Sequence, residues 1–161
     1  LPGVGAFQKA MKNISKNGLL DALNEYKKKG KPILGICLGM QLMCSSSTED
    51  GFCQGLNWID AKIEKFPQKI GFTVPHIGWN GIEHKSNNHL FTDISEKNDF
   101  YFVHSFRVSK INHKFIIGTT NYINNFCSAF SDENIFGVQF HPEKSQGSGL
   151  RLLENFVSLK C

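Results

Sequence analysis

A short apolar run that ends in a cysteine between two glycines constrains the fold of this chain more than any other feature. Residues 33 to 39 read ILGICLG and follow Pro32. The run Ile33 to Ile36 has no polar residue, which is typical of a strand buried on both faces of a parallel sheet. Residues 38–46 have the pattern of a helix. We therefore predict that a strand turns sharply into a helix at Cys37.

A corner of this kind holds its central residue in a strained conformation and needs glycine on both sides. Gly35 and Gly39 meet that need, so the pattern is the elbow G-x-S-x-G with Cys in place of Ser. The helix N-terminus then lowers the thiol pKa, and the Leu38 N–H points to where an oxyanion would form. The alternative is that Cys37 is a small buried hydrophobe in a tight turn.

The rest of the chain predicts an α/β protein. A helix is expected over residues 8–29, with Gly30 as its C-terminal cap. From residue 58 onwards the segments read as consecutive strands without helices between them, which indicates an antiparallel or mixed part of the sheet. These segments are 58–66, 100–108, 114–122, 126–133 and 135–141. A closing helix follows, and we expect Leu150, Leu153 and Val157 to pack on the sheet.

Length and composition allow one domain with a real core, spanning residues 1–161. Of the 161 residues, 40% are hydrophobic and 14 are Phe, which supplies ample apolar surface for that core. The net charge is +4, and the densest basic run, Lys27 to Lys31, lies where the first helix ends. There, lysines favour the helix dipole. No basic stripe with interleaved aromatics is present, so we expect no nucleic-acid partner.

The cysteines indicate a reducing compartment. There are five, an odd number, with no C-x-x-C pair and no regular spacing, so neither a disulfide framework nor a zinc site is expected. No His, Cys, Asp and Glu grouping has the spacing of metal ligands, and we predict no metal. No signal peptide opens the sequence and no apolar run approaches 18 residues. We expect a cytoplasmic protein without a membrane partner.

A nucleophile at Cys37 needs a base and a group that orients the base. His141 ends the strand-like run 135–141 and precedes Pro142, so it lies at the edge where α/β sites are built. Glu143, two residues later, can fold back onto the imidazole. With the elbow, these residues make a Cys-His-Glu triad. Of the other histidines, His104 lies inside a strand, and the rest lie in polar or turn-like segments and are expected to be surface or structural.

Two motifs carry a family resemblance, GICLGMQ at 35–41 and GVQFHPE at 137–143. With them the chain resembles class I glutamine amidotransferases. LPGVGAF at 1–7, PHIGWN at 75–80 and YFVHSF at 101–106 are similar to the glutaminase subunits of imidazole glycerol phosphate synthase, from histidine biosynthesis. The resemblance implies a flavodoxin-like fold with a mixed, mostly parallel central sheet and flanking helices.

The resemblance also implies the chemistry. Cys37 attacks the carboxamide of glutamine, His141 carries the proton to the departing ammonia, and Glu143 orients His141. Leu38 and the loop Gly3, Val4 and Gly5 donate the N–H groups of an oxyanion hole. Water then hydrolyses the glutamyl thioester, and no cofactor takes part.

For substrate and partner, the resemblance implies that Gln41 and the segment His104, Ser105 and Phe106 hold the amino-acid end of glutamine. The ammonia passes to a (β/α)8-barrel synthase subunit in a heterodimer, which makes imidazole glycerol phosphate and an aminoimidazole carboxamide nucleotide. Family members begin with a further βα unit and a strand, on the order of 40 to 50 residues. We therefore expect either that this chain is incomplete at its N-terminus or that something else covers the edge of the sheet that those elements would leave exposed.

Three alternatives remain open. A paralogous amidotransferase would supply ammonia to another synthase, for example one that amidates a nucleotide-linked sugar. A non-catalytic subunit would keep the fold and bind a partner, but it would be expected to have lost Cys37 or His141. A thiol hydrolase or protease is disfavoured because the carboxylate of Glu143 follows the histidine by two positions.

Overall fold

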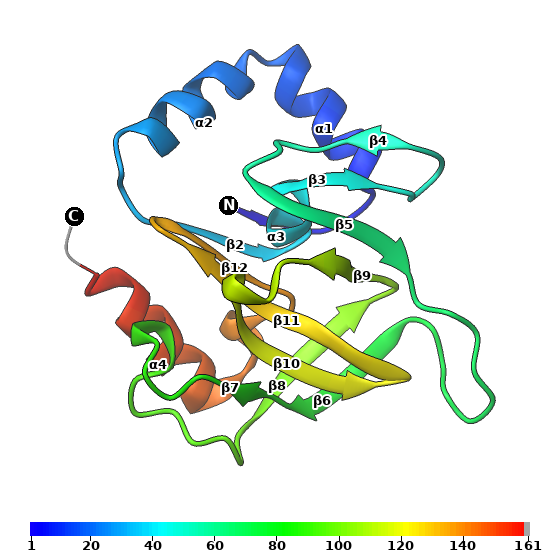
Figure 1. Cartoon of the computed structure of the whole chain (residues 1–161), viewed down its shortest axis with the longest axis vertical. Coiled ribbons are helices and arrows are strands. Elements are labelled where there is room, and N and C mark those ends of the chain that lie inside the picture. The colour runs from blue at the N-terminus through cyan, green and yellow to red at the C-terminus, as the bar shows by residue number, and fades with distance from the viewer. Residues whose placement is uncertain (160–161) are drawn as a thin grey trace.

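The computed structural model describes residues 1–159 as two groups of helices around a curled sheet (Figure 1). The α-helices are α1 Phe7–Lys16, α2 Leu19–Lys28, α3 Leu38–Leu42 and α4 Gln146–Val157. Single 3-10 turns are η1 His89–Phe91, η2 His113–Phe115 and η3 Pro142–Lys144. The strands are β1 Pro2–Gly3, β2 Ile33–Cys37, β3 Cys44–Ser47, β4 Cys53–Gln54, β5 Ile59–Lys65, β6 His76–Gly81, β7 Glu83–His84, β8 Asp99–His104, β9 Phe106–Ile111, β10 Ile116–Tyr122, β11 Asn124–Asp132 and β12 Ile135–Val138.

Ten of the strands described in residues 1–159 form one sheet. Its order is β1-β2-β12-β11-β9-β5-β3-β4, with β10 paired to β11 and β7 paired to β10. β6 and β8 form a separate antiparallel ribbon, which lies at the lower edge of the molecule in Figure 1. The ribbon and the large sheet are joined where β8 runs into β9.

The mixed sheet with flanking helices is confirmed. The sheet was expected to be mostly parallel, but most of its strand pairs are antiparallel. The parallel pairs in the described chain are β1 with β2, β2 with β12, and β3 with β5, and the other pairs are antiparallel. Two hairpins in the second half contribute to this difference. β10, β11 and β12 follow one another through short turns, and a short turn can join only antiparallel neighbours.

The core has two parts, one on each face of β2 and β12. Ile33 faces a cluster with Phe7 and Met11 of α1, whereas the adjacent Leu34 faces a cluster with Phe136 and Leu152 of α4. This alternation explains why the run 33–36 has no polar residue, because α1 and α4 cover opposite faces of the same strand (Figure 1).

The helix expected over residues 8–29 is two helices. α1 ends at Lys16 and α2 begins at Leu19, and Gly18 between them has φ 67°. Glycine adopts this left-handed conformation at little cost, and its N–H bonds to the Ser15 carbonyl at 3.2 Å. The apolar spacing continues across the break, so periodicity alone did not reveal it.

Two other expected elements have different bounds. The helix after Cys37 ends at Leu42 rather than Ser46, because residues 44–47 pair with β5 as strand β3. The segment 100–108 is two strands, β8 and β9, which separate at Ser105 and belong to different sheets. This separation turns the chain at residues 104–106.

The closing helix is confirmed as α4, and of the three residues expected to pack on the sheet only Leu153 does so. Leu150 is 59% exposed and Val157 is 81% exposed, whereas Leu152 and Gly149 are buried. The rotation of the helix is set by Gly149, where a Cβ would overlap the Pro142 carbonyl. This close approach needs a residue without a side chain, so Gly149 faces inwards and Leu150 faces outwards.

Within residues 1–159, no helix combines the length and the apolar character needed to cross a membrane.

Candidate active site

Cys37 occupies the predicted corner between β2 and α3. Its φ of 52° and ψ of −110° lie outside the regions favoured by residues with a side chain, so the backbone is strained there. A Cβ at Gly35 would lie 2.7 Å from the Met40 backbone nitrogen, and one at Gly39 would overlap the Leu1 carbonyl. The requirement for glycine on both sides of Cys37 is therefore confirmed.

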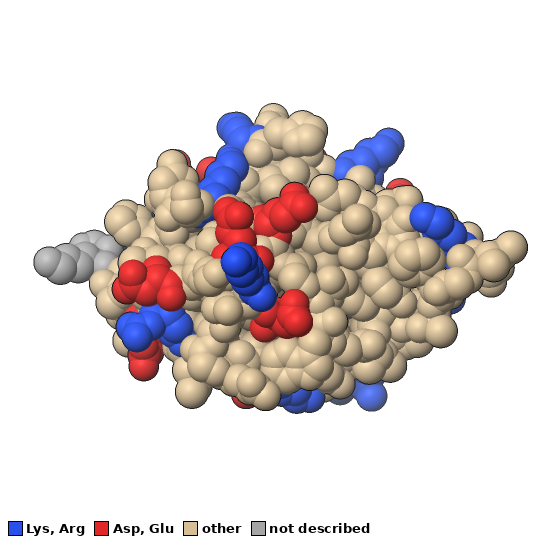
Figure 2. Space-filling model, turned by 90° about the horizontal axis from the view of Figure 1, so that it is seen from below, with Lys and Arg blue, Asp and Glu red and all other residues tan. Residues whose placement is uncertain are grey.

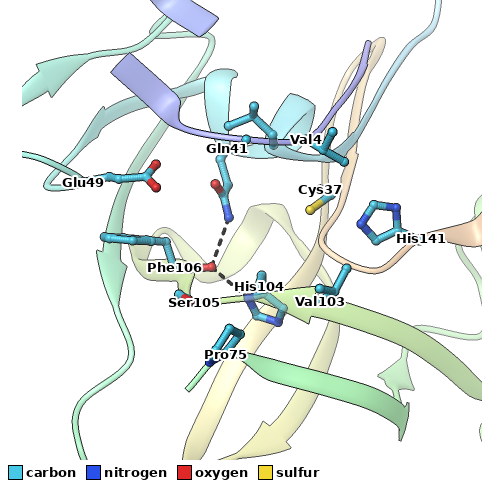
Figure 3. Close-up of a pocket in the computed structure, with 12 residues that line it drawn as sticks. Val4, Cys37, Gln41, Glu49, Pro75, Val103, His104, Ser105, Phe106 and His141 are labelled. Carbon is cyan, nitrogen blue, oxygen red and sulfur yellow. Dashed lines mark hydrogen bonds between the residues drawn. The ribbon is translucent and has the colours of Figure 1, made fainter. Parts of the chain in front are cut away.

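The Cys37 side chain lines a cavity of about 320 Å³. His141 lines the same cavity, although it follows a different strand, β12, which pairs with β2 in parallel register. Because both strands end at the same edge of the sheet, residues distant in the sequence meet there. Figure 3 shows both side chains at one end of the cavity.

Most of the residues expected at the site surround this cavity, and two do not. Those that line it are Val4, Gly5, Cys37, Leu38, Gln41, His104, Ser105, Phe106 and His141. Gly3 does not line it and instead pairs with Cys37 at the end of β1. Glu143 also lies outside the lining and reaches His141 from behind, with its side chain 48% exposed.

His141 is held in one orientation. Its Nδ1 lies 2.7 Å from Glu143 Oε1, which is the contact expected from the two-residue spacing. Its backbone N–H donates to the Tyr101 carbonyl at 2.8 Å, and its carbonyl accepts from Ser145 Oγ at 2.6 Å. The other ring nitrogen, Nε2, is buried and has no hydrogen-bond partner within residues 1–159.

The Cys37 thiol is protonated at neutral pH, contrary to the sequence expectation. Burial raises its pKa from 9.0 to about 11, although hydrogen bonds from the Leu38 backbone and the Gln139 side chain lower the pKa in part. The negative Glu143 carboxylate also raises the pKa. The helix that begins here has only five residues, too few for its dipole to outweigh the loss of water around the sulfur.

Two buried amides link the cavity wall to the sulfur. Gln41 Nε2 donates to the Phe106 carbonyl at 3.0 Å (Figure 3) and to Gln139 Oε1 at 3.0 Å. Gln139 Nε2 lies 3.7 Å from Cys37 Sγ. Gln139 was not expected at the site, because within the run 135–141 it reads as one more strand residue.

Glu49 is a second residue that the sequence did not indicate. Its carboxylate lies on the cavity wall opposite His141 (Figure 3), and Oε2 accepts the Phe7 N–H at 2.8 Å. The surrounding polar run, STED at 47–50, has the composition of a solvent-facing turn, so no spacing or motif marked it. Pro75 and Val103 complete the lining.

Within the described part of the chain, no three His, Cys, Asp or Glu side chains are placed to hold a metal ion. The four cysteines at positions 37, 44, 53 and 127 are free thiols.

With this site and fold described, the chain can be assigned to a class. It belongs to the class I glutamine amidotransferase family, because residues 1–159 match the sequence profile of "glutamine amidotransferase class-I". This confirms the resemblance and the enzyme class expected from the sequence.

The relatives narrow the class. The chain is 46% identical to imidazole glycerol phosphate synthase subunit HisH 1 of Campylobacter jejuni strain 81-176, over 99% of this chain and 79% of that protein. It is 48% identical to subunit HisH 2 of Methanococcus maripaludis, over 98% and 78%. It is 42% identical to subunit HisH of Aquifex aeolicus, over 97% and 74%.

Solved structures agree with the fold. A glutamine amidotransferase of Thermotoga maritima superposes with a TM-score of 0.62 at 21% identity, covering 98% of this chain and 60% of that one. Another structure described as a glutamine amidotransferase gives a TM-score of 0.66 at 15% identity, covering 97% and 77%.

Proposed function

We propose that this chain is the glutaminase subunit of an imidazole glycerol phosphate synthase, acting in histidine biosynthesis. It hydrolyses glutamine to glutamate and ammonia, and the ammonia is passed to a synthase partner. The observation that carries the proposal is the shared cavity of Cys37 and His141. Glu143 holds the His141 ring through Nδ1, and Nε2 has no partner in the part of the chain that the structure describes. The identity to HisH subunits over almost the whole chain supports this choice of synthase.

In this mechanism, Cys37 Sγ attacks the carboxamide carbon of glutamine while His141 Nε2 accepts the thiol proton. The raised pKa of Cys37 supports a proton that leaves the sulfur only when a substrate carbonyl is present. His141 then gives the proton to the departing nitrogen, and ammonia leaves behind a glutamyl thioester. A water molecule, deprotonated by His141 Nε2, then hydrolyses the thioester, and His141 returns that proton to the sulfur to restore the thiol. Glu143 keeps Nδ1 protonated, so that Nε2 is the basic nitrogen.

The oxyanion of each tetrahedral intermediate needs backbone donors. Leu38 supplies one at the start of α3, where its N–H already acts to lower the pKa of the Cys37 thiol. We assign the second to the loop formed by Gly3, Val4 and Gly5. Gly5 has φ 104° and open space around its Cα, which leaves the loop free to direct an N–H into the cavity.

The other end of the cavity fits the amino-acid part of glutamine. The Glu49 carboxylate is suited to the α-ammonium group, and the backbone of His104, Ser105 and Phe106 is suited to the carboxylate. Gln41 completes this wall. The sizes agree, because about 320 Å³ is at the lower end of the range for small-molecule sites.

We further propose that the partner is a (β/α)8-barrel synthase subunit that binds beside β6. Ile77 is 60% exposed and Trp79 is 47% exposed, which is unusual for large apolar side chains on one short strand. Trp79 packs edge-on against Tyr101 at 5.9 Å, and Lys144 lies 5.8 Å above the Tyr101 ring. Figure 2 shows the side of the molecule on which β6 lies, with a broad area free of Lys, Arg, Asp and Glu.

This apolar surface adjoins the reaction centre, since Lys144 follows Glu143 in η3. A partner bound there would receive ammonia a short distance from where it is released. The free thiols of the described chain support a reducing location, and we place the enzyme in the cytoplasm.

A glutamine-like diazo ketone tests the nucleophile. We expect it to label Cys37 stoichiometrically, and Cys37→Ala to abolish glutamine hydrolysis while binding of the barrel subunit is kept. Cys53→Ser is the matched control, because Cys53 is a partly exposed thiol on β4 outside the cavity. Labelling only at cysteines other than Cys37, or hydrolysis that survives in Cys37→Ala, would refute the assignment.

The choice of synthase is tested separately. With the barrel subunit of imidazole glycerol phosphate synthase present, glutamine turnover should rise when its phosphoribosyl-formimino-aminoimidazole substrate is added. Trp79→Ala should weaken the complex, whereas Leu150→Ala on α4 should not. A chain that binds no barrel subunit but shows glutaminase activity would serve another synthase.

A further inference from the structure

Gln139 is fully buried directly beside the sulfur of Cys37. Its backbone N–H donates to the Ser128 carbonyl at 2.9 Å, which fixes the main chain, and its side-chain Nε2 lies 3.7 Å from Cys37 Sγ. Whether this amide helps or hinders a negative sulfur depends on which end faces it. An N–H would stabilise a thiolate, and a carbonyl oxygen would repel it.

Two sets of hydrogen bonds meet at the Phe106 carbonyl beside this site, and one of them begins at Asn80 on β6. Asn80 Oδ1 accepts the Gly81 N–H at 2.9 Å, so its Nδ2 is the end that faces the Asn121 carbonyl at 3.2 Å and His76 Nε2 at 3.3 Å. Since Nδ2 can only donate, His76 Nε2 accepts and its Nδ1 carries the proton.

The two imidazoles pass this polarity on. His76 Nδ1 lies 3.1 Å from His104 Nε2, which therefore accepts, and His104 Nδ1 donates to the Phe106 carbonyl at 2.8 Å. Burial lowers the pKa of His76 from 6.5 to about 4 and that of His104 to about 3. Both rings are therefore neutral near pH 7, as a chain with one proton per contact requires.

The Phe106 carbonyl accepts a second hydrogen bond, from Gln41 Nε2 at 3.0 Å. A carbonyl cannot donate, so Gln41 must direct its NH₂ group to this point. The same NH₂ reaches Gln139 Oε1 at 3.0 Å, which leaves Gln139 Nε2 towards Cys37. A reversed Gln139 would place its NH₂ group against the NH₂ group of Gln41, with no acceptor between them.

We propose that Gln139 is a catalytic residue whose N–H stabilises the developing thiolate of Cys37, and that Gln41, itself oriented by the Phe106 carbonyl, is the positioning residue that fixes its direction. This inference rests on the proposed function, in which Cys37 is the nucleophile. Asn80 follows Trp79, so the chain joins the proposed partner surface to the sulfur through consecutive hydrogen bonds. A partner that shifts β6 acts on the first link.

The test is the pH profile of Cys37 alkylation by iodoacetamide, followed by mass spectrometry of the Cys37 peptide. Gln139→Met keeps the length of the side chain and removes the donor. Loss of one hydrogen bond to the charged thiolate should slow alkylation about tenfold at each pH from 7 to 10. The pH profile of alkylation would then lie about one pH unit higher than that of the wild type. The matched control, Gln54→Met on the exposed strand β4, should follow the wild-type profile.

A folded Gln139→Met variant with the wild-type profile would overturn the proposal. The readout does not require glutamine. If Gln139→Met shifts the alkylation profile but the wild-type protein hydrolyses no glutamine, the proposed function is refuted and the role of the Gln139 N–H stands. A purely structural role would lower the unfolding temperature without moving the profile of the folded protein.

A second variant keeps the proposal testable if Gln139→Met does not fold. Gln41→Met removes the N–H that holds Gln139 Oε1 at 3.0 Å and should slow Cys37 alkylation in the same direction as Gln139→Met. A folded Gln41→Met protein with the wild-type alkylation profile would contradict the proposal.

Discussion

Glu143 Oε1 lies 2.7 Å from Nδ1 of His141, while Nε2 of the same ring is buried and has no hydrogen-bond partner among the described residues 1–159. The two nitrogens of one imidazole therefore have separate partners, a carboxylate for one and the open site for the other. The carboxylate is half exposed, so water can take part of its place when it is removed.

Replacement of Glu143 should lower the rate of glutamine hydrolysis without weakening substrate binding. We expect Glu143→Gln to reduce kcat for glutamine hydrolysis by about 10²-fold, at the lower end of the effect of a general base, with KM little changed. The equivalent change at the exposed Glu154 of α4, Glu154→Gln, should leave kcat at its wild-type value. A Glu143→Gln enzyme as fast as the wild type would show that His141 needs no carboxylate.

The elbow glycine should be sensitive to a single methyl group. In Gly35→Ala the new Cβ would meet the backbone of residues 39 and 40, which cannot move aside cheaply, and we expect a loss of about 3 kcal/mol in the free energy of unfolding. Gly147→Ala is the matched control, since a Cβ there has open space and the residue is helical. It should raise stability by about 0.5 kcal/mol. Urea unfolding measures both, and equal stability of the two variants would contradict the packing described for the corner.

The buried imidazole pair should make stability depend on pH. His76 and His104 have folded-state pKa values of about 4 and about 3, below the ordinary 6.5. Between about pH 4 and pH 6.5 the histidines of the unfolded chain bind protons, whereas His76 and His104 of the folded protein do not. The stabilisation is therefore fully present above about pH 6.5 and decreases as the pH falls towards 4.

His76→Phe tests this dependence, because His76 stacks between Phe102 at 4.7 Å and Tyr122 at 3.9 Å, where a phenyl ring fits. The variant should lose less stability between pH 7.5 and pH 5 than the wild type, as measured by urea unfolding midpoints. An identical loss in both proteins would mean that His76 does not titrate as described.

The face of α4 that packs on the sheet can be tested with one pair of identical substitutions. Leu152→Ala should cost about 3 kcal/mol of unfolding free energy, because it empties a fully buried site. Leu150→Ala, two residues earlier, should change stability by less than about 0.5 kcal/mol, since Leu150 is 59% exposed. A larger loss of stability in Leu150→Ala than in Leu152→Ala would contradict this orientation of α4.

Local sequence patterns were sufficient to predict the nucleophile and the base of the site. The two glycines around Cys37 and the pair His141 and Glu143 are each contained in a few consecutive residues, so their backbone geometry follows from local sterics. The buried strand at 33–36 and the final helix were also evident, because their apolar spacing depends only on the element itself.

Other features depended on contacts between distant segments. The rotation of α4 is set by Gly149 against Pro142, and the break at Ser105 arises because β8 and β9 join different sheets. Glu49 reaches the cavity only because the chain before β4 folds over the N-terminus of α1. None of these contacts leaves a periodic signal.

The sequence by itself determined that a thiol stands at a strand-to-helix corner and that an imidazole with a carboxylate follows another strand. Only the tertiary structure decided the ionisation of that thiol and the direction of the Gln139 amide. Both depend on what surrounds a buried group in three dimensions: loss of water raises the pKa of Cys37 to about 11, and Gln41, held by the Phe106 carbonyl, orients the amide beside it.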